Sequence, residues 1–377
     1  MPLSIFIDAL PYTEITEKYS DWFSDMQIAE LQPNIAYSSS LHWQLYCNKY
    51  PDERGVLVDW AKMPEKNKAV RFFATVLRPL DSMGDLGIYS RKFLDRYIFR
   101  ANKFANIPYK FRKDFSENGK YLFWDEKTYR AEKIFNGYTV VSQDEGHISF
   151  EETVKKLENA IKNGDKNIFT AMGFTDQLGH KCRRGEIYHK RVKPYMAEMH
   201  RVISKYLKSN PAEEVIIISD HGMSTINEKV DLCLEKKFGK QSKKSYIAYS
   251  DSAVMCIWCG DEKLKKEIAE YLGSQSVGHL LTEEEREKYR AADRKFGDLI
   301  FNLREGYVFA ESWFGKSLRK PSPDGAGMHG FWPELSAKDQ MACILLINGR
   351  QRLEKLYDYP RANKLLEKIM QERNEKL

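Results

Sequence analysis

Short apolar runs recur along the chain, and in three of them an acidic residue follows within a few positions. Residues 3–7 (LSIFI) are apolar and end at Asp8. Residues 167–172 (NIFTAM) and 215–218 (VIII) have a similar length and a similar content of β-branched side chains. Runs of four to eight such residues are typical of strands buried on both faces of a sheet. The pattern therefore predicts strands at these three places.

Helical patterns separate the predicted strands. Residues 154–161 and 195–207 show apolar spacing typical of helices, and Ser149 with Glu152 matches a capping box in front of the first of them. Strands that alternate with helices favour a largely parallel sheet covered by helices on both faces, which is the α/β class. Two further apolar runs predict additional strands: 253–258 and 342–347.

The alternation stops between residues 78 and 138, where aromatic and basic side chains follow one another without a clear period. We interpret 78–138 as a cap inserted into a catalytic core formed by 1–77 and 139–377. Residues 274–325 are a possible smaller insertion within that core. The cap aromatics either grip the part of a ligand that lies away from the reacting group or form a small core of their own.

Composition and charge narrow the classes of protein. The chain has 377 residues, of which 42% are hydrophobic and 30% charged, as in ordinary globular proteins. Its net charge of +6 permits an anionic substrate but does not predict specific nucleic-acid binding. We expect no membrane-spanning segment, because no apolar run reaches the required length. The start of the chain lacks the pattern of a signal peptide and the six cysteines are scattered, so we expect a cytoplasmic protein.

Acids and histidines follow the predicted strands. Because ligands bind at the carboxyl ends of strands in open α/β sheets, these side chains are candidates for one site. Carboxylate and imidazole together suit zinc, with manganese as the alternative. Each fragment alone favours a structural role, whereas their shared position at strand ends favours metal binding. The candidates are Asp8, Asp176, His180, Asp220, His221 and His329.

A candidate nucleophile precedes a helical stretch. Ser38, Ser39 and Ser40 stand before WQLYCNKY, and a serine at a helix start can direct its oxygen along the axis, where free N–H groups attract phosphate. A metal ion can lower the pKa of such a hydroxyl group. The alternative is that these serines only cap the helix.

The order of these motifs resembles the alkaline phosphatase superfamily, and within it the type I phosphodiesterase/nucleotide pyrophosphatase family. The resemblance rests on Asp8, YSSSLHWQLYCNKYPDERGV, FTDQLGH, SDHGM and GMHGF. In that family the nucleophile stands thirteen residues before the proline of a Tyr-Pro pair. The corresponding proline here is Pro51, so the resemblance implies Ser38 as the nucleophile. The family usually has threonine at this position. The implied fold is an alkaline-phosphatase-like sandwich with an inserted cap.

The resemblance also implies two sets of metal ligands. One ion would be held by Asp176, His180 and His329, and the other, beside Ser38, by Asp8, Asp220 and His221. Where the family commonly has an asparagine that contacts a phosphate oxygen, this chain has Asp59. A carboxylate at that position would repel a phosphate dianion, so Asp59 is a candidate for substrate contact with altered geometry.

Together these patterns predict a metal-dependent phosphoester hydrolase that acts on a small-molecule or nucleotide-like substrate. A phosphodiesterase with a phosphoserine intermediate is the preferred form. A phosphomonoesterase, or a phosphotransferase or mutase on the same scaffold, is an alternative. A second alternative is a non-catalytic module that binds anions through the cap. The sequence leaves the oligomeric state open.

Overall fold

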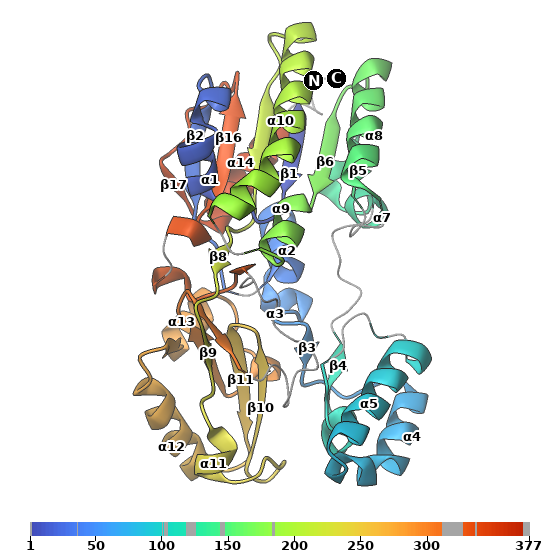
Figure 1. Cartoon of the computed structure of the whole chain (residues 1–377), viewed down its shortest axis with the longest axis vertical. Coiled ribbons are helices and arrows are strands. Elements are labelled where there is room, and N and C mark those ends of the chain that lie inside the picture. The colour runs from blue at the N-terminus through green and yellow to red at the C-terminus, as the bar shows by residue number, and fades with distance from the viewer. Residues whose placement is uncertain are drawn as a thin grey trace.

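The computed structural model describes residues 2–35, 37–99, 101, 105–117, 126–143, 148–182, 185–310, 327–335 and 338–371. A seven-stranded sheet, in the order β17-β2-β16-β7-β1-β6-β5, forms the centre of the upper half of the molecule in Figure 1. Its strands are β1 (Leu3–Ile7), β2 (Gln27–Leu31), β5 (Thr139–Ser142), β6 (Ile168–Met172), β7 (Val215–Ile218), β16 (Ala342–Ile347) and β17 (Leu356–Tyr357). Of the paired strands only β16 runs against its neighbours, so the sheet is mostly parallel, as predicted.

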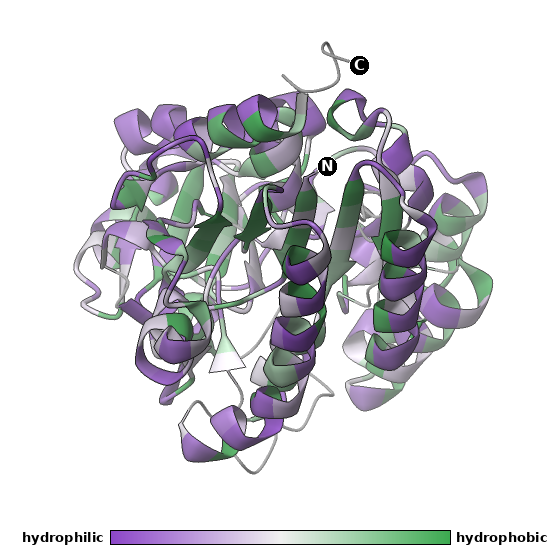
Figure 2. Cartoon of the chain, turned by 90° about the horizontal axis from the view of Figure 1, so that it is seen from above, coloured by the Kyte–Doolittle hydropathy of each residue, from purple (hydrophilic) through white to green (hydrophobic). Residues whose placement is uncertain are grey.

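Helices cover both faces of this sheet. One face is covered by α1 (Tyr12–Lys18), α8 (Phe150–Asn163), α9 (Phe174–Gly179) and α10 (Glu186–Ser209). The other face is covered by α2 (Ser38–Cys47), α7 (Glu126–Arg130) and α14 (Tyr359–Gln371). Figure 2 shows the apolar strands between helices whose outward faces are hydrophilic. This layering confirms the predicted α/β class.

The alternation of side chains along β1 shows how the sequence produces two cores. Leu3, Ile5 and Ile7 pack against α8 and α10, whereas Phe6 points to the opposite face and packs against α2 and α14. Successive side chains of a strand point to opposite faces, so a strand that is apolar throughout is buried on both sides. The predicted N-cap is also present, since the Ser149 hydroxyl accepts a hydrogen bond from Glu152 N at 3.1 Å.

A second, four-stranded sheet lies below the first in Figure 1. It consists of β10 (Tyr246–Asp251), β11 (Val254–Cys259), β13 (Leu299–Leu303) and β12 (Gly278–Leu280), in that order, accompanied by α11 (Leu234–Phe238), α12 (Glu262–Gly273) and α13 (Glu283–Lys288). Two strand pairs adjoin it: β9 (Glu228–Val230) with β14 (Tyr307–Phe309), and β8 (Ser224–Thr225) with β15 (Gly327–Met328). The short strands β12 and β13 fall within the predicted smaller insertion at 274–325, whose boundaries stay a prediction.

A group of short helices, here called the helical lobe, stands apart from the central sheet at the lower right of Figure 1. It contains α4 (Lys68–Val76), the 3-10 turn η2 (Arg78–Ser82), α5 (Asp85–Phe93), the π-helical turn η3 (Leu94–Ile98) and α6 (Tyr109–Arg112). The remaining short elements are η1 (Ser20–Phe23), α3 (Pro51–Arg54), β3 (Trp60–Ala61), β4 (Ser116–Glu117), η4 (Lys133–Phe135), η6 (Arg294–Phe296), η7 (Pro333–Leu335) and η8 (Lys338–Gln340).

The helical lobe covers only part of the predicted cap. α4 precedes residue 78 but contacts α6, and Phe111 and Phe115 join the core of the second sheet. Tyr129 and Phe135 return to the central sheet. The division into a core and a cap at 78–138 therefore stays a prediction. The cap aromatics Phe104, Tyr121, Phe123 and Trp124 lie outside the described residues.

Candidate functional site

Three adjacent parallel strands bring the predicted ligands to one edge of the central sheet. β1 lies between β7 and β6, and all three end at the same edge. Asp8 follows β1, Asp220 and His221 follow β7, and Asp176 lies in the first turn of α9, which follows β6. His180 comes one helical turn after Asp176, so both side chains lie on the same side of α9. The strand order thus accounts for five of the six predicted ligands.

The sixth ligand reaches this edge through the pairing of β15 with β8. Gly327 lies opposite Thr225, a few residues after β7, and His329 follows at once. A Cβ atom at Gly327 would lie 2.6 Å from the carbonyl oxygen of Gly179, so only glycine permits this approach to the end of α9. The glycine therefore allows His329 and His180 to lie side by side, with ring centroids 5.2 Å apart.

One group of side chains centres on Asp176. Its Oδ1 atom lies 3.2 Å from His180 Nε2 and 3.5 Å from His329 Nε2. His329 is buried, and Asp176 and His180 are half-buried. This is the first of the two predicted ligand sets.

A second group surrounds His221. Its Nε2 atom lies 3.5 Å from Asp8 Oδ1 and 3.2 Å from Asp220 Oδ2. The hydroxyl of Ser38 lies 2.9 Å from the same nitrogen and donates a hydrogen bond of 3.5 Å to Asp8 Oδ1. The His221 ring stacks on His329 with centroids 3.7 Å apart, so the two groups adjoin. The structure therefore brings all six predicted ligands and Ser38 together.

The cluster has the properties of a metal centre. Three overlapping sets of residues could each hold a metal ion, because the ligand atoms within each set lie within 4.8 Å of one another. The sets are Asp176–His180–His329, Asp8–Asp176–His221 and Asp8–His42–Asp220. Within them, Asp176 Oδ1, Asp220 Oδ2 and His329 Nδ1 are buried and have no hydrogen-bond partner among the described residues. Buried polar atoms are normally paired, so unpaired carboxylate oxygens facing imidazole nitrogens fit the coordination of a cation.

Backbone carbonyls orient two of the imidazoles. The Nδ1 atom of His221 lies 2.8 Å from the carbonyl oxygen of Gly222, and Nδ1 of His180 lies 3.2 Å from that of Gly327. If Nδ1 carries the proton, each ring donates to its carbonyl and presents an unprotonated Nε2 to the carboxylates. Partners of this kind fix the tautomer and the direction of histidines that bind metals.

The carboxylates of the cluster have strongly shifted pKa values. Burial raises the pKa of Asp8 well above its usual value, and the charges of Asp220 and Asp176 raise it further. Burial also disfavours ionisation of Asp176 and Asp220, but the neighbouring histidines outweigh it and hold the pKa of each below its usual range. Burial, with His221 beside it, lowers the pKa of His329 well below the usual value. Carboxylates that repel one another, beside a histidine whose charged form is disfavoured, form a site that a divalent cation would stabilise.

Ser38 is the first residue of α2 and does not cap it. The N-cap position is Tyr37, which makes no side-chain capping bond. The Tyr37 hydroxyl donates to the backbone oxygen of Asp251 and accepts a hydrogen bond of 3.1 Å from Ala253 N, which fixes the start of the helix against the second sheet. The Ser40 hydroxyl accepts a hydrogen bond of 3.1 Å from Gln44 inside the same helix. Of these two serines, only Ser38 faces the cluster.

His42 adjoins this site although it is not among the six predicted ligands. It is fully buried one helical turn after Ser38, and its Nε2 atom lies 3.4 Å from Asp220 Oδ2. Its ring packs edge-on against Phe6, with centroids 4.4 Å apart. The four-residue spacing from Ser38 was the available signal, because residues i and i+4 share a helix face.

Asp59 is half-buried in the segment before β3. It lies close enough to Tyr37 for its charge to add to burial and to the charge of Asp251 in raising the pKa of that tyrosine. Asp59 is therefore within electrostatic range of the residue that precedes Ser38. Its contact with substrate stays a prediction.

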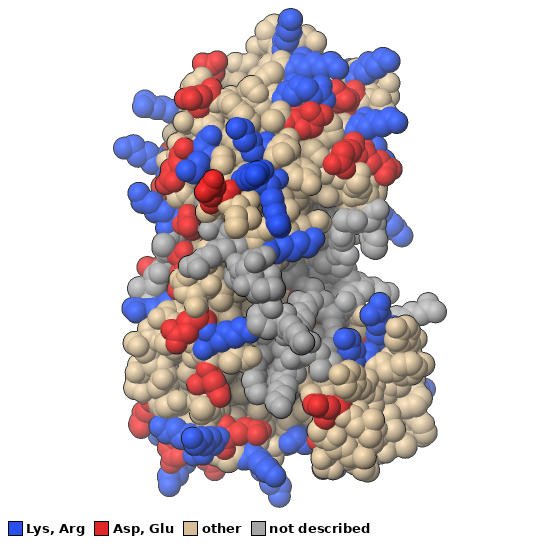
Figure 3. All heavy atoms as spheres, viewed as in Figure 1, with Lys and Arg blue, Asp and Glu red and all other residues tan. Residues whose placement is uncertain are grey.

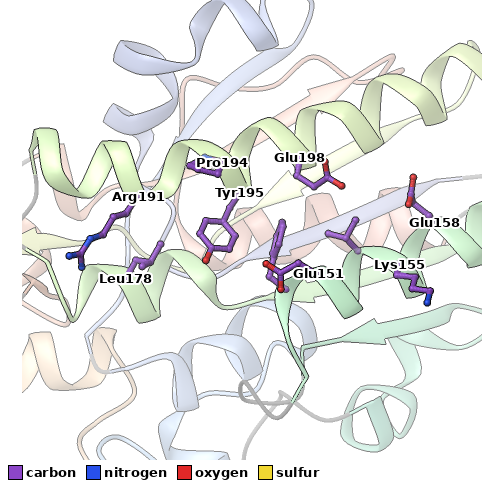
Figure 4. Close-up of a pocket in the computed structure, with 10 residues that line it drawn as sticks. Glu151, Lys155, Glu158, Leu178, Arg191, Pro194, Tyr195 and Glu198 are labelled. Carbon is purple, nitrogen blue, oxygen red and sulfur yellow. The ribbon is translucent and has the colours of Figure 1, made fainter.

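A groove of about 590 Å³ lies on the other side of α9 (Figure 4). Phe150, Leu178 and Tyr195 supply apolar surface, and charged side chains of α8 and α10 lie around them. Leu178 stands between Asp176 and His180 in sequence and therefore points away from them on the helix. None of the cluster residues lines this groove, so it is distinct from the candidate metal centre.

Comparison with known proteins identifies the family. The sequence model of the type I phosphodiesterase/nucleotide pyrophosphatase family matches residues 113–332, more than half of the chain. The chain belongs to this family, whose members are metal-dependent hydrolases of phosphoester bonds. The match includes Asp176, His180, Asp220, His221 and His329 but excludes Asp8 and Ser38, which only the fold brings to the others.

Solved structures agree on the fold. Human ectonucleotide pyrophosphatase/phosphodiesterase 5 superposes with a TM-score of 0.59 at 15% identity, covering 98% of this chain and 94% of that one. The murine protein gives a TM-score of 0.58 with the same identity and coverage, as does its inactive variant in complex with AMP. No curated protein sequence matches. The similarity confirms the predicted alkaline-phosphatase-like fold.

Proposed function

We propose that this enzyme hydrolyses phosphodiester bonds with Ser38 as the nucleophile and two divalent metal ions in the Asp/His cluster. The observation that carries the proposal is the position of Ser38 Oγ, 2.9 Å from His221 Nε2 at the start of helix α2. A hydroxyl in this place adjoins both the metal-capable side chains and the N–H groups of a helix N-terminus, which favour phosphate.

The cluster divides between the two ions according to its two groups. Asp176, His180 and His329 hold one ion, and Asp8, Asp220 and His221 hold the other beside Ser38. Three carboxylates and three imidazoles favour zinc, with manganese as the alternative. Bound divalent ions would lower the pKa of the serine hydroxyl and of water and offset the charge of the phosphoryl oxygens.

The residues of the chain then act in two steps. Ser38 Oγ forms a bond to phosphorus while the bond from phosphorus to the first alcohol oxygen breaks, and the serine proton ends on that alcohol. Water next cleaves the phosphoserine ester, which restores Ser38 and releases a phosphomonoester. The α2 N–H groups are placed to attract the phosphoryl oxygens during both steps. His42, whose Nε2 atom lies 3.4 Å from Asp220 Oδ2, helps to position the Asp220 carboxylate.

The proposed substrate is a nucleotide-like phosphodiester. The family name and the complex of the murine relative with AMP support a nucleotide. The carboxylate of Asp59 would favour a diester, with one negative charge, over a doubly charged monoester. We also propose a cytoplasmic location, which the six free cysteines support.

A panel of substrates tests this proposal. Aryl phosphodiesters, aryl phosphomonoesters and nucleotide esters are assayed side by side, each with and without an alcohol acceptor. We expect the highest kcat/KM on a nucleotide diester and the same products with or without the acceptor. A phosphorylated acceptor as the main product would instead identify a phosphotransferase, and no turnover on any ester would leave only an anion-binding role.

A further inference from the structure

Strongly exposed apolar side chains gather in the helical lobe. Ten large apolar side chains of the described residues expose 41–63% of their surface, and eight of them lie between residues 72 and 98. We call these eight the apolar patch: Phe72, Val76, Met83, Leu86, Tyr89, Phe93, Tyr97 and Ile98. Scattered exposed apolar residues are normal on a protein surface, whereas a concentration of them marks an interaction site.

The helices of the lobe turn these side chains outward in a regular way. Leu86, Tyr89, Phe93 and Tyr97 follow one another at spacings of three and four residues along α5 and η3, so they form one stripe. Phe93 and Tyr97 touch, with ring centroids 5.2 Å apart. The opposite side of the same segment, which includes Leu94, is buried. The lobe has thus an inner core and, in addition, an outer apolar stripe.

Phe72 and Val76 repeat this arrangement on α4. They are one turn apart and expose 63% and 55% of their surface, while Val70 and Ala74 are buried. α4 and α5 are joined through η2, which contacts both. Two helices of the lobe therefore present apolar side chains to solvent.

Basic side chains accompany the apolar patch. Between residues 66 and 98 the exposed charged side chains are one acid, Asp85, and six bases: Lys66, Lys68, Arg71, Arg78, Lys92 and Arg96. The other two acids of this segment, Asp81 and Asp95, form ion pairs with Arg91 and Arg112. The guanidinium of Arg96 lies 5.5 Å from the ring centroid of Tyr97. Figure 3 shows the lobe, at the lower right, as a largely uncharged surface with basic side chains along its upper margin.

The charge of the patch decides between possible partners. In a symmetric dimer the same surface faces itself, so the six bases would repel their copies. An anionic lipid surface attracts the bases and also accepts Phe, Tyr, Leu and Ile side chains at the level of its headgroups. We propose that the helical lobe rests on an anionic lipid surface, with the apolar patch in the headgroup region. None of the helices in the described segments is long and apolar enough to cross a membrane, so the contact is peripheral.

Sedimentation with lipid vesicles tests this proposal and does not depend on the phosphodiesterase chemistry. We expect the wild-type protein to bind vesicles of phosphatidylcholine mixed with phosphatidylserine, to bind pure phosphatidylcholine weakly, and to dissociate as salt is added. The double variant Lys92→Glu/Arg96→Glu should bind at least about twentyfold more weakly, because each basic residue near an anionic surface contributes about fivefold. Phe93→Ser/Tyr97→Ser should also lose binding, and hydrolysis of a soluble substrate should be unchanged in both.

Matched controls separate the patch from general surface properties. Ile187 exposes 60% of its surface on α10, and Lys208 and Lys266 are exposed away from the lobe. Ile187→Ser and Lys208→Glu/Lys266→Glu should bind vesicles within about twofold of wild type. If Phe93→Ser/Tyr97→Ser does not keep the wild-type thermal transition, Phe72→Ser/Val76→Ser is tested in its place.

Two outcomes would overturn the proposal. The first is a wild-type protein that stays in solution with mixed vesicles, or patch variants that bind them as well as wild type does. The second is a dimer in sedimentation velocity without lipid that Phe93→Ser/Tyr97→Ser dissociates, since a second copy would then cover the patch.

Discussion

The edge of the central sheet and the helical lobe differ in what they bury. At the sheet edge, charged and ionisable side chains such as Asp8, Asp220 and His221 are almost completely buried. In the lobe, aromatic side chains such as Tyr89 and Phe93 are exposed. Both arrangements run against the usual distribution of polar and apolar groups. Each arrangement costs free energy unless a ligand or partner binds there. Each region therefore indicates a binding function.

The two regions also differ in how far the sequence predicts them. The metal-capable cluster could be predicted from the strands. A short apolar run predicts a strand, and the residues that follow it must lie near the carboxyl end of that strand. β1, β7 and β16 occur at the predicted residues, and β6 begins one residue later than predicted. The residue missed there, His42, does not follow a predicted strand. His42 lies inside a helix, and its relation to Asp220 appears only when α2 packs on the sheet.

The helical lobe was less predictable for a physical reason. Its aromatic residues could equally form a small core or contact a ligand, because they follow one another without a clear period that would show which of them lie on the same side of a helix. The structure assigns Tyr109 and Leu94 to the inner side and Tyr97 to the outer side. The lobe also begins before residue 78, since α4 packs on α6 through a contact that no local pattern indicates.

The largest expected effect concerns the nucleophile. Ser38→Ala should lower kcat by at least about a thousandfold, because no other step can replace formation of the phosphoserine. Metal content should remain near wild type, since all six ligands are present. Ser38→Thr should retain measurable turnover because its hydroxyl keeps the same place.

Ser40→Ala is the matched control for this position, because Ser40 lies in the same helical turn but bonds to Gln44. It should keep most of the activity. If Ser39→Ala proves to be the inactive variant and Ser38→Ala is active, the assignment of the nucleophile is wrong by one residue.

His42 should affect metal binding rather than chemistry alone. His42→Leu removes the group that lies 3.4 Å from Asp220 Oδ2, and we expect metal affinity to fall by about ten- to a hundredfold. Added metal should then restore much of the activity. His42→Gln, which keeps a polar side chain near the Asp220 carboxylate, should recover part of the affinity. Metal titration against a competing chelator measures this, and an unchanged affinity in His42→Leu would show a role in packing only.

A buried acid in the lobe predicts a pH dependence of stability. Burial raises the pKa of Asp95 from 3.8 to about 6, although Arg112 lies beside it. Its carboxyl is therefore favoured in the protonated form when folded, and this stabilising contribution is lost as pH rises through about 6. Asp95→Asn should raise the free energy of unfolding at pH 8 by up to about 3 kcal/mol and leave it nearly unchanged at pH 4. Equal destabilisation at both pH values in denaturant unfolding would contradict this.

The smallest expected effect is at Asp59. Asp59→Asn removes a half-buried negative charge near Tyr37, and inorganic phosphate should then inhibit about two- to fivefold more strongly at low salt. The preference for diesters over monoesters should decrease by a similar factor. Steady-state inhibition and substrate comparison measure both quantities. An unchanged inhibition constant would place Asp59 away from the substrate.

The central claim is that the buried Asp/His cluster holds the metal ions on which hydrolysis depends. Elemental analysis and activity, measured on the same sample before chelation, after chelation and after return of zinc or manganese, test it most directly. We predict close to two equivalents of metal in protein purified without chelator, no turnover after their removal, and recovery as two equivalents return. A chelated protein that contains no metal and retains full phosphodiesterase activity would contradict the account.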